Sequence, residues 1–339
     1  MKLIRTEDAV GHVLCHDMTQ IIKDQYKDAR FRKGHVVTAE DIPVLLSMGK
    51  EHLYVWEMTP GMVHENDAAE RLLALCGQEN MIRSEVKEGK IELKAACDGL
   101  FLVDSARLVA VNSQDEVMIA TRKGGTAVRK GDKLAGMRVI PLIIAEEKLQ
   151  KAEIAAGAEP LLALKPFVRK SACIVATGGE VKKGLIRDTF TPVVREKLKA
   201  YGIETTEVVY SGDGVENVRD AVLSLRAKGP DMILCTGGMS VDPDDNTPGG
   251  IKAAGAGIVC YGAPVLPGAM FLLGYFDDGM PIMGLPGCVM YAGATIFDLV
   301  LPKVAADVPV TRGEVAALGE GGLCLGCKEC RYPICPFGK

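Results

Sequence analysis

The sequence predicts an α/β fold whose largest part is a doubly wound parallel sheet over residues 165–308. Apolar runs typical of strands alternate there with amphipathic helical stretches, and such alternation favours right-handed βαβ crossovers. Three of the predicted strands also end in glycine-rich turns. Ligands of such sheets bind outside the carboxyl ends of the strands, so this edge is where we expect a site.

The elements of this region follow from periodicity. The predicted strands are SACIVAT, IETTEVVY, DMILCT and MPIMGL. Two predicted helices, over 189–201 and 215–228, place apolar residues on one face: Phe190, Val193, Val194, Leu198 and Tyr201, then Val215, Val218, Val222 and Leu225. A last helix is predicted over 288–301. The uncharged stretch 253–276 contains two prolines and five glycines, which predicts buried strands and turns rather than a membrane span.

Smaller domains are predicted on either side. Residues 1–60 form a small α+β region, with strand, helix and strand over 35–57 and Thr38 as the helix N-cap. Residues 61–150 form an α+β or mostly β domain, in which a helix over 67–76 precedes the strand-like runs KIELKA, GLFLVD, RLVAVN, EVMIAT and MRVIPLII. Residues 309–339 form a cysteine-rich tail outside the sheet domain.

The glycine loops predict an anion site. They cover Thr177–Glu180, Thr236–Pro248 and Gly284–Gly287, each directly after a predicted strand. Glycine lets backbone N–H groups approach an anion closely, and a following helix N-terminus favours negative charge. Three such loops at one sheet edge predict a phosphate or polar-heterocycle site, and ordinary βα turns are the alternative. We expect a side chain at Gly238 to block the ligand and leave the fold largely intact.

Carboxylates accompany the same loops. They are Glu180, Asp188, Asp213, Asp242, Asp244 and Asp245. Together with a ligand phosphate they could hold Mg²⁺, which binds through one or two carboxylates. The alternative for each is helix capping, above all for Asp188 beside a predicted helix start. The nearby Lys182, Lys183 and Arg187 either pair with a phosphate or form a solvated basic face.

The order of these motifs resembles a known family. TGGE, IRDTF, VVYSGD, TGGMSVDPDDNTP and GLPGCVMYA follow one another between residues 168 and 306 as in the molybdopterin-binding domain of molybdenum-cofactor biosynthesis proteins. TGGMSV and GLPG resemble the molybdopterin molybdenumtransferases. The run Asp245–Pro248 is similar to the molybdopterin adenylyltransferases.

The resemblance implies a set of site residues. Glu180, Asp213 and Asp245 match acidic, catalytic positions at the pterin-phosphate and metal site. The matching cofactor-binding positions are Thr177, Gly178, Gly179, Asp188, Thr236, Gly237, Gly238, Ser240, Gly284, Leu285, Pro286 and Gly287. It also implies molybdopterin or molybdenum cofactor as ligand, Mg²⁺, and a homo-oligomer.

Three departures leave the activity open. GLPG continues with Cys288 and Val289 instead of asparagine and proline, and Val265–Gly268 lacks the family's lysine. The family's N-terminal methionine-aspartate-glycine-tyrosine run is missing as well. One interpretation is Mg²⁺-dependent molybdate insertion into adenylylated molybdopterin. The other is a non-catalytic carrier or sensor that delivers cofactor to a client molybdoenzyme, and an unrelated nucleotide-phosphate hydrolase is a third hypothesis.

The tail predicts a second site. Cys324, Cys327, Cys330 and Cys335 place four thiols within twelve residues, followed by Pro336. The spacing is one residue longer in its last gap than the bacterial ferredoxin run, which favours an iron–sulfur cluster. Zinc, and free or disulfide-linked thiols, are the alternatives.

Charge and composition exclude some classes. The net charge is −4, from 40 Lys+Arg and 44 Asp+Glu, and aromatic residues make up 5% of the chain. Neither a basic excess nor an aromatic stacking surface is present, so we expect no nucleic-acid partner. The first thirty residues carry charges throughout, with no apolar targeting segment, so we expect a cytoplasmic protein without membrane contact.

Overall fold

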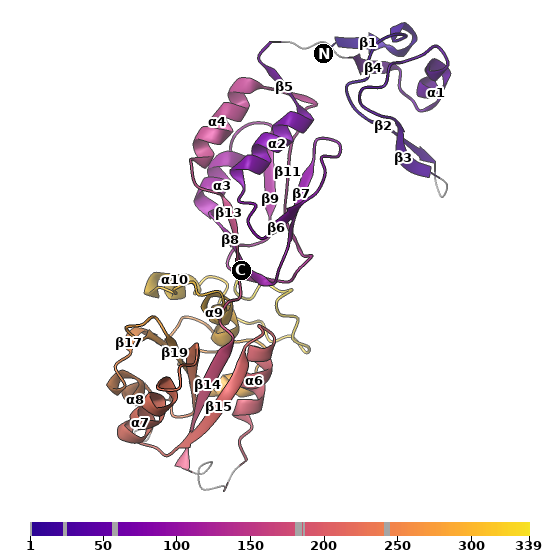
Figure 1. The fold of residues 1–339 in the computed structure, drawn as a ribbon. Helices are drawn as coiled ribbons and strands as arrows, with labels where there is room; N and C mark the ends of the chain where they lie inside the picture. The colour runs from indigo at the N-terminus through magenta and orange to yellow at the C-terminus, as the bar shows by residue number, and fades with distance from the viewer. Residues whose placement is uncertain (1, 23–25, 56–59, 180–184, 186, 241–244) are drawn as a thin grey trace. The chain divides into compact units, whose positions relative to one another are not determined.

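The computed structural model describes residues 2–22, 26–55, 60–179, 185, 187–240 and 245–339 (Figure 1). The chain forms two compact units, each built from more than one segment. Unit 1 consists of Met1–Ala96, Val103–Gly124 and Lys130–Ala163, and unit 2 of Cys97–Leu102, Gly125–Arg129 and Leu164–Lys339. No helix within the described residues is both long enough and apolar enough to cross a membrane.

The first part of unit 1 is a small α+β region. β1 (Lys2–Arg5) pairs antiparallel with β4 (His52–Val55), and β2 (Met18–Ile22) pairs with β3 (Tyr26–Phe31). The 3₁₀ helix η1 (Thr6–Asp8) and the helix α1 (Asp41–Ser47) complete it. Thr38 is not the N-cap that the sequence predicts. The observed N-cap is Glu40, two residues later. The N–H and hydroxyl groups of Thr38 donate to the Asp41 carboxylate, both at 2.8 Å.

The rest of unit 1 contains three helices and an antiparallel sheet of order β6-β7-β11-β9. The strands are β6 (Met81–Arg83), β7 (Ile91–Ala95), β9 (Val117–Thr121) and β11 (Lys133–Val139), and β5 (Met62–His64) pairs separately with β12 (Ile143–Ala145). The helices are α2 (Glu65–Leu75), α3 (Ser105–Asn112) and α4 (Glu146–Ala156). The strand predicted for RLVAVN is wrong. The residues form α3, because Asp104 accepts from the N–H of Arg107 at 3.0 Å and starts a helix.

Unit 2 contains a six-stranded sheet of order β15-β14-β16-β19-β18-β17. Its strands are β14 (Ser171–Thr177), β15 (Glu204–Ser211), β16 (Met232–Thr236), β17 (Gly257–Tyr261), β18 (Leu272–Tyr275) and β19 (Pro281–Leu285). The first four in the spatial order are parallel, and β18 runs antiparallel to both of its neighbours. The predicted parallel sheet is confirmed, and two further strands, β18 and β17, extend it on one side by antiparallel pairing.

Helices cover both faces of this sheet (Figure 1). Successive strand residues point to opposite faces. Ala172 and Ile174 of β14 accordingly pack in a core with α6 (Phe190–Lys199) and α9 (Ile296–Ala305). Cys173 and Val175 pack in a second core with α7 (Val215–Arg226) and α8 (Thr247–Ala253). The sheet is therefore doubly wound, as predicted.

The last predicted helix begins later than expected. Residues 287–290 form a 3₁₀ turn, η2 (Gly287–Met290), and α9 starts at Ile296. Thr295 and Asp298 form a capping box at that start, which defines the helix end more strongly than the apolar pattern from residue 288.

Unit 2 also includes short strands and the tail. β8 (Gly99–Val103) pairs with β10 (Thr126–Val128), and β13 (Leu162–Pro166) is the third strand of that sheet. After α10 (Arg312–Ala317) the chain continues to residue 339 without a helix or strand. The tail nevertheless packs on the sheet domain, since Phe337 is 3% exposed within the core that contains α9.

The contact between α7 and α8 gives a test of this packing. A Cβ on Gly250 of α8 would lie 2.5 Å from the Cβ of Val218 on α7, too close without a backbone shift. Gly250→Ala should therefore lower the free energy of unfolding of unit 2 by about 1–3 kcal/mol, measured by urea denaturation. Gly313→Ala in α10 is the matched control, because its Cβ meets no atom closer than 4.0 Å. The control should be neutral or slightly stabilising. Equal stability of both variants would contradict the close packing.

Candidate functional site

The carboxyl ends of four parallel strands meet at one edge of unit 2. Thr177, Ser211, Thr236 and Leu285 are their last residues. β14 lies between β15 and β16, so the chain leaves β14 toward one side and returns on the other. This reversal of strand order is the switch point at which open α/β sheets form a ligand crevice. The loops after β14 and β16 flank it.

Buried threonines tie these two loops together. The Thr177 hydroxyl donates to the carbonyl of Thr236 at 2.9 Å, and the Thr247 hydroxyl donates to the carbonyl of Gly237 at 2.9 Å. The two hydroxyl oxygens lie 3.3 Å apart. Thr177, Thr236 and Thr247 are 9%, 2% and 1% exposed, so their side chains hold the loops in shape and do not face solvent. Sequence reasoning missed Thr247. A threonine before Pro248 at the first turn of α8 is the signal that could have identified it.

The backbone of the second loop requires glycine. Gly237 and Gly238 have φ values of +82° and +56°. A Cβ on Gly238 would lie 2.6 Å from the Thr247 hydroxyl oxygen, and one on Gly237 would lie 2.6 Å from the Thr177 carbonyl oxygen. The expectation that a side chain at Gly238 would leave the fold intact is therefore wrong, because it would push against the threonines that hold the loop.

Two of the predicted carboxylates accept hydrogen bonds from loop amides. The N–H of Gly179 donates to Asp213 at 3.0 Å, and the N–H of Ser240 donates to Asp245 at 2.9 Å. Asp213 thereby joins the loop after β15 to the loop after β14, while Asp245 closes its own loop. The N-caps of the described helices that follow them, α7 and α8, are Gly214 and Asn246. An N–H group that points at a carboxylate oxygen is oriented for an anion, and the two aspartates fill that role in this structure.

Asp188 has the capping role that the sequence left as its alternative. Its carboxylate accepts from the N–H groups of Phe190 and Thr191 at 2.9 and 3.0 Å, at the start of α6. Its second oxygen accepts from the Tyr210 hydroxyl at 3.3 Å. Burial alone would raise the pKa of Asp188, but the hydrogen bonds from Thr191, Phe190 and Tyr210 outweigh it and lower the pKa below its ordinary value.

The GLPG turn joins the same edge through β19. Gly284 lies opposite Cys235 of β16, and a Cβ on Gly284 would collide with Met239 of the second loop. Leu285 and Pro286 are buried, so their side chains belong to the core. Gly287 is exposed, and a Cβ built on it would meet nothing within 4 Å. Of the four residues of the turn, Gly287 is the one that borders open space.

Several predicted residues lie outside the described part of the chain. These are Glu180, Lys182, Lys183, Asp242 and Asp244. Among the residues that are described, no three His, Cys, Asp or Glu side chains converge in a way that could hold a metal ion. This statement covers the tail, where Cys327 and Cys330 are exposed and Cys324 and Cys335 are half-buried.

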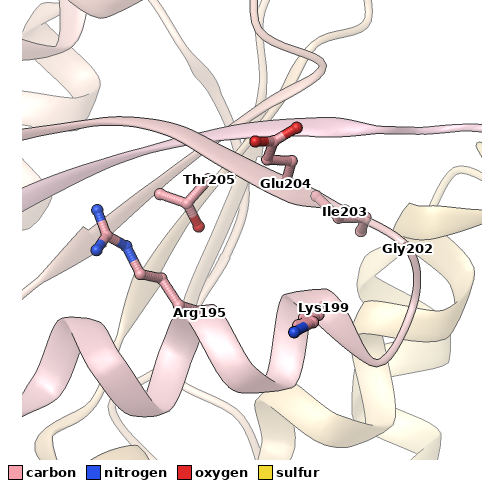
Figure 2. Close-up of a pocket in the computed structure, with 6 residues that line it drawn as sticks. All are labelled: Arg195, Lys199, Gly202, Ile203, Glu204 and Thr205. Atoms are coloured by element: carbon pink, nitrogen blue, oxygen red, sulfur yellow. The ribbon is translucent and has the colours of Figure 1, made fainter.

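A pocket of about 570 Å³ lies away from the glycine loops (Figure 2). Its lining consists of Arg195, Lys199, Gly202, Ile203, Glu204 and Thr205. These residues belong to the end of α6 and the start of β15, whereas the loops follow the carboxyl ends of the strands. The pocket is therefore separate from the predicted site.

Comparison with known proteins bears on both ends of the chain. Residues 173–306 match the family described as "Probable molybdopterin binding domain", and residues 3–57 match a "Domain of unknown function (DUF8806)". A CinA-like protein from Desulfosudis oleivorans is 36% identical over 81 residues, which are 24% of this chain and 19% of that protein. The chain thus spans less than a fifth of the length of this curated relative.

Two solved structures each align with about two fifths of this chain. MoaB, a molybdopterin biosynthesis enzyme from Thermus thermophilus, is 20% identical, with 41% of this chain and 98% of that one covered at a TM-score of 0.35. The molybdopterin biosynthesis Mog protein from Mycobacterium ulcerans is 21% identical, with 41% and 97% covered at a TM-score of 0.34. By the family match and the ordered motifs, residues 173–306 are a molybdopterin-binding domain of the molybdenum-cofactor biosynthesis type.

Proposed function

We propose that the glycine-loop edge of unit 2 binds the phosphate end of molybdopterin, or of its adenylylated form. The observation that carries this proposal is the position of the loops after β14, β16 and β19 at one sheet edge, on either side of the switch point. Threonine hydroxyls join the described ends of the first two loops to each other.

The donor set at this edge suits Mg²⁺. Carboxylate oxygens are hard ligands, and Mg²⁺ needs only one or two of them beside substrate phosphate and water. Asp213 and Asp245 are the described candidates, with Glu180 as the third predicted acid. A bound cation would supply positive charge next to the ligand phosphate. Asp213 and Asp245 would turn toward the cation and release the N–H groups of Gly179 and Ser240 to the phosphate. Binding of the metal and of the phosphate would then strengthen each other.

Two activities are compatible with such a site. In the first, the protein inserts molybdate into adenylylated molybdopterin in a Mg²⁺-dependent reaction. In the second, it carries or senses the cofactor and delivers it to a client molybdoenzyme. One observation favours the second. In the segment Val265–Gly268, where the related transferases have a lysine, the backbone is bonded to the tail. The N–H of Leu266 donates to Gly322 and its carbonyl accepts from Cys324, both at 2.8 Å.

Turnover separates the two activities. The purified chain is incubated with adenylylated molybdopterin, molybdate and Mg²⁺, and release of the nucleotide is followed. Release that requires both molybdate and Mg²⁺ supports the transferase. Tight binding of molybdopterin without release supports the carrier. A nucleotide-phosphate hydrolase would release nucleotide without molybdate.

We also propose an oligomeric state, a metal on the tail and a cellular compartment, none of which the pterin site requires. A homo-oligomer follows from the family resemblance. A metal on the tail cysteines, iron–sulfur or zinc, is the second inorganic component. The cytoplasm is the compartment that we propose for the chain.

Gly287 gives a direct test of the site. Its Cβ position is open, so Gly287→Val should place a side chain where the ligand lies without disturbing the protein. We expect the variant to bind molybdopterin at least about tenfold more weakly, a loss of about 1.4 kcal/mol, with the melting temperature of the parent. Isothermal titration and thermal denaturation measure the two quantities. Gly313→Ala in α10 is a control that should bind like the parent. Parental affinity in Gly287→Val would remove the GLPG turn from the site.

Asp245 gives a test of the metal. Asp245→Asn keeps an oxygen that accepts from the N–H of Ser240 and removes the negative charge. We expect the ligand-free variant to keep its stability and to lose at least about tenfold in Mg²⁺-dependent affinity for molybdopterin. The matched control is Asp220→Asn, which removes the charge of an exposed aspartate on α7. Titrations of both variants with molybdopterin, with and without Mg²⁺, measure this affinity. An unchanged Mg²⁺ dependence in Asp245→Asn would exclude this residue as a metal ligand.

A further inference from the structure

The cysteine-rich tail forms a loop whose two ends, near residues 321–324 and 338, are held together and fixed to unit 2. Leu323 forms a β-bridge with Leu266, flanked by the two backbone hydrogen bonds of Leu266 with Gly322 and Cys324. At the other end, the N–H of Gly338 donates to the carbonyl of Gly321 at 3.0 Å. The residues that carry all four thiols therefore lie between two points that are held close together.

A second anchor lies inside this loop. The Tyr332 hydroxyl donates to the carbonyl of Asp298 in α9 at 3.0 Å. Its ring meets that of Phe337 edge-on, with centroids 6.2 Å apart, and Phe337 is 3% exposed. Cys330 and Cys335 flank this anchored tyrosine in the chain.

The segment between the anchors has no regular structure of its own. Residues 324–335 form only turns and bends, and all four cysteines are free thiols. Cys324 and Cys335 pack against the core beside α9, while Cys327 and Cys330 are exposed. Bringing the exposed thiols to the half-buried ones requires rearrangement of turns, and no helix or strand has to break.

The spacing selects the kind of metal centre. Zinc sites built from cysteines use two short pairs separated by a longer stretch that forms the body of the module. Here the gaps are two, two and four residues, so three thiols follow at every third position and a fourth comes five residues later. Closely repeated thiolates of this kind bind iron–sulfur clusters. In two-cluster ferredoxins the fourth cysteine of the run binds the second cluster, whereas here all four thiols lie in a single run.

We propose that the tail binds a thiolate-ligated iron–sulfur cluster of the [4Fe–4S] type, with Cys324, Cys327, Cys330 and Cys335 as ligands. Each thiol loses its proton and forms a sulfur–iron bond, so binding releases protons. The loop, which the chain anchors but gives no internal structure, becomes ordered around the inorganic core.

The cluster lies beside the segment that leaves the proposed pterin edge. A Cβ on Gly293 would lie 2.7 Å from the Cys330 sulfur, so the tail rests on the backbone of this residue. Gly293 follows the GLPG turn by six residues, and its carbonyl accepts from Lys197 of α6 at 3.0 Å. This places a redox-active group next to the chain between Gly287 and α9. Formation of the cluster itself does not rest on the proposed pterin function.

The experiment uses the full chain, purified without oxygen and incubated with iron salts and sulfide. We expect about four iron and four acid-labile sulfide per chain, broad visible absorbance that bleaches on reduction, and an electron paramagnetic resonance signal in the reduced state. The variant Cys327→Ser/Cys330→Ser keeps two of the four ligands and should lose the iron, the sulfide and the signal. Both residues are exposed in this structure, so the variant should keep the parental melting temperature of the metal-free protein.

The control is Cys97→Ser, which changes a half-buried cysteine outside the tail and should keep the full cluster. One zinc per chain that iron and sulfide do not displace would overturn the proposal, as would tail disulfides in the oxygen-free protein. Parental iron content in the double variant would overturn it too. Molybdopterin binding is measured on the same samples. Iron without pterin binding refutes the proposed function alone, and pterin binding without iron refutes the cluster alone.

Discussion

The parallel pairing of β14 with strands on both of its sides determines where everything else in unit 2 lies. β14 is the first strand of the sheet in the chain, yet it lies inside, between the second and the third. The chain must therefore wind in opposite directions from it, which places α6 and α9 on one face and α7 and α8 on the other. Such a strand is buried on both faces, and six of its seven residues are buried. Its last residue, Thr177, has a buried hydroxyl that donates to the carbonyl of Thr236 at the end of β16.

Two carboxylates of the protein itself accept hydrogen bonds from the N–H groups of the glycine loops. Loops that expose N–H groups to attract an anion are costly when empty, since unpaired donors and like-oriented dipoles accumulate there. Asp213 and Asp245 relieve this cost by accepting from Gly179 and Ser240. The negative charge of Asp245 also affects the pKa of Tyr261. Burial is the first cause of its raised pKa, and the charge of Asp245 adds to it. An incoming phosphate must therefore displace a carboxylate that already accepts from these N–H groups.

The sequence predicted the parts of the fold in which two signals agree. The strands of the parallel sheet and the helices α6 and α7 have apolar patterns and clear breaking residues, and they were placed nearly as observed. α3 was mistaken for a strand because RLVAVN has strand-like residues, and the cap from Asp104 outweighs that preference. α9 was started too early for a similar reason, since its capping box lies in the interior of an apolar run. In both cases a hydrogen bond between neighbouring residues decided against a pattern.

The candidate site was only partly accessible to this reasoning. Glycine loops after strands can be located from the chain alone, but the partner of each polar group depends on contacts between segments far apart in sequence. Asp188 and Asp213 look alike in the sequence, yet one caps α6 and the other joins two loops. The link from Thr247 to Thr177 spans 70 residues, and no local spacing indicates it.

The attachment of the tail to unit 2 limits where the chain can be shortened without loss of stability. Gly322 and Cys324 form hydrogen bonds with the backbone of Leu266, and Phe337 is buried in the core that contains α9, with Tyr332 packed against that core. Cleavage before residue 322 would do more than discard four thiols. It would leave the Leu266 backbone groups without partners and open one flank of the sheet domain to water. A fragment trimmed to the family boundary at residue 306 is thus expected to aggregate, so a fragment for crystallisation or domain transplantation should retain residues 307–339.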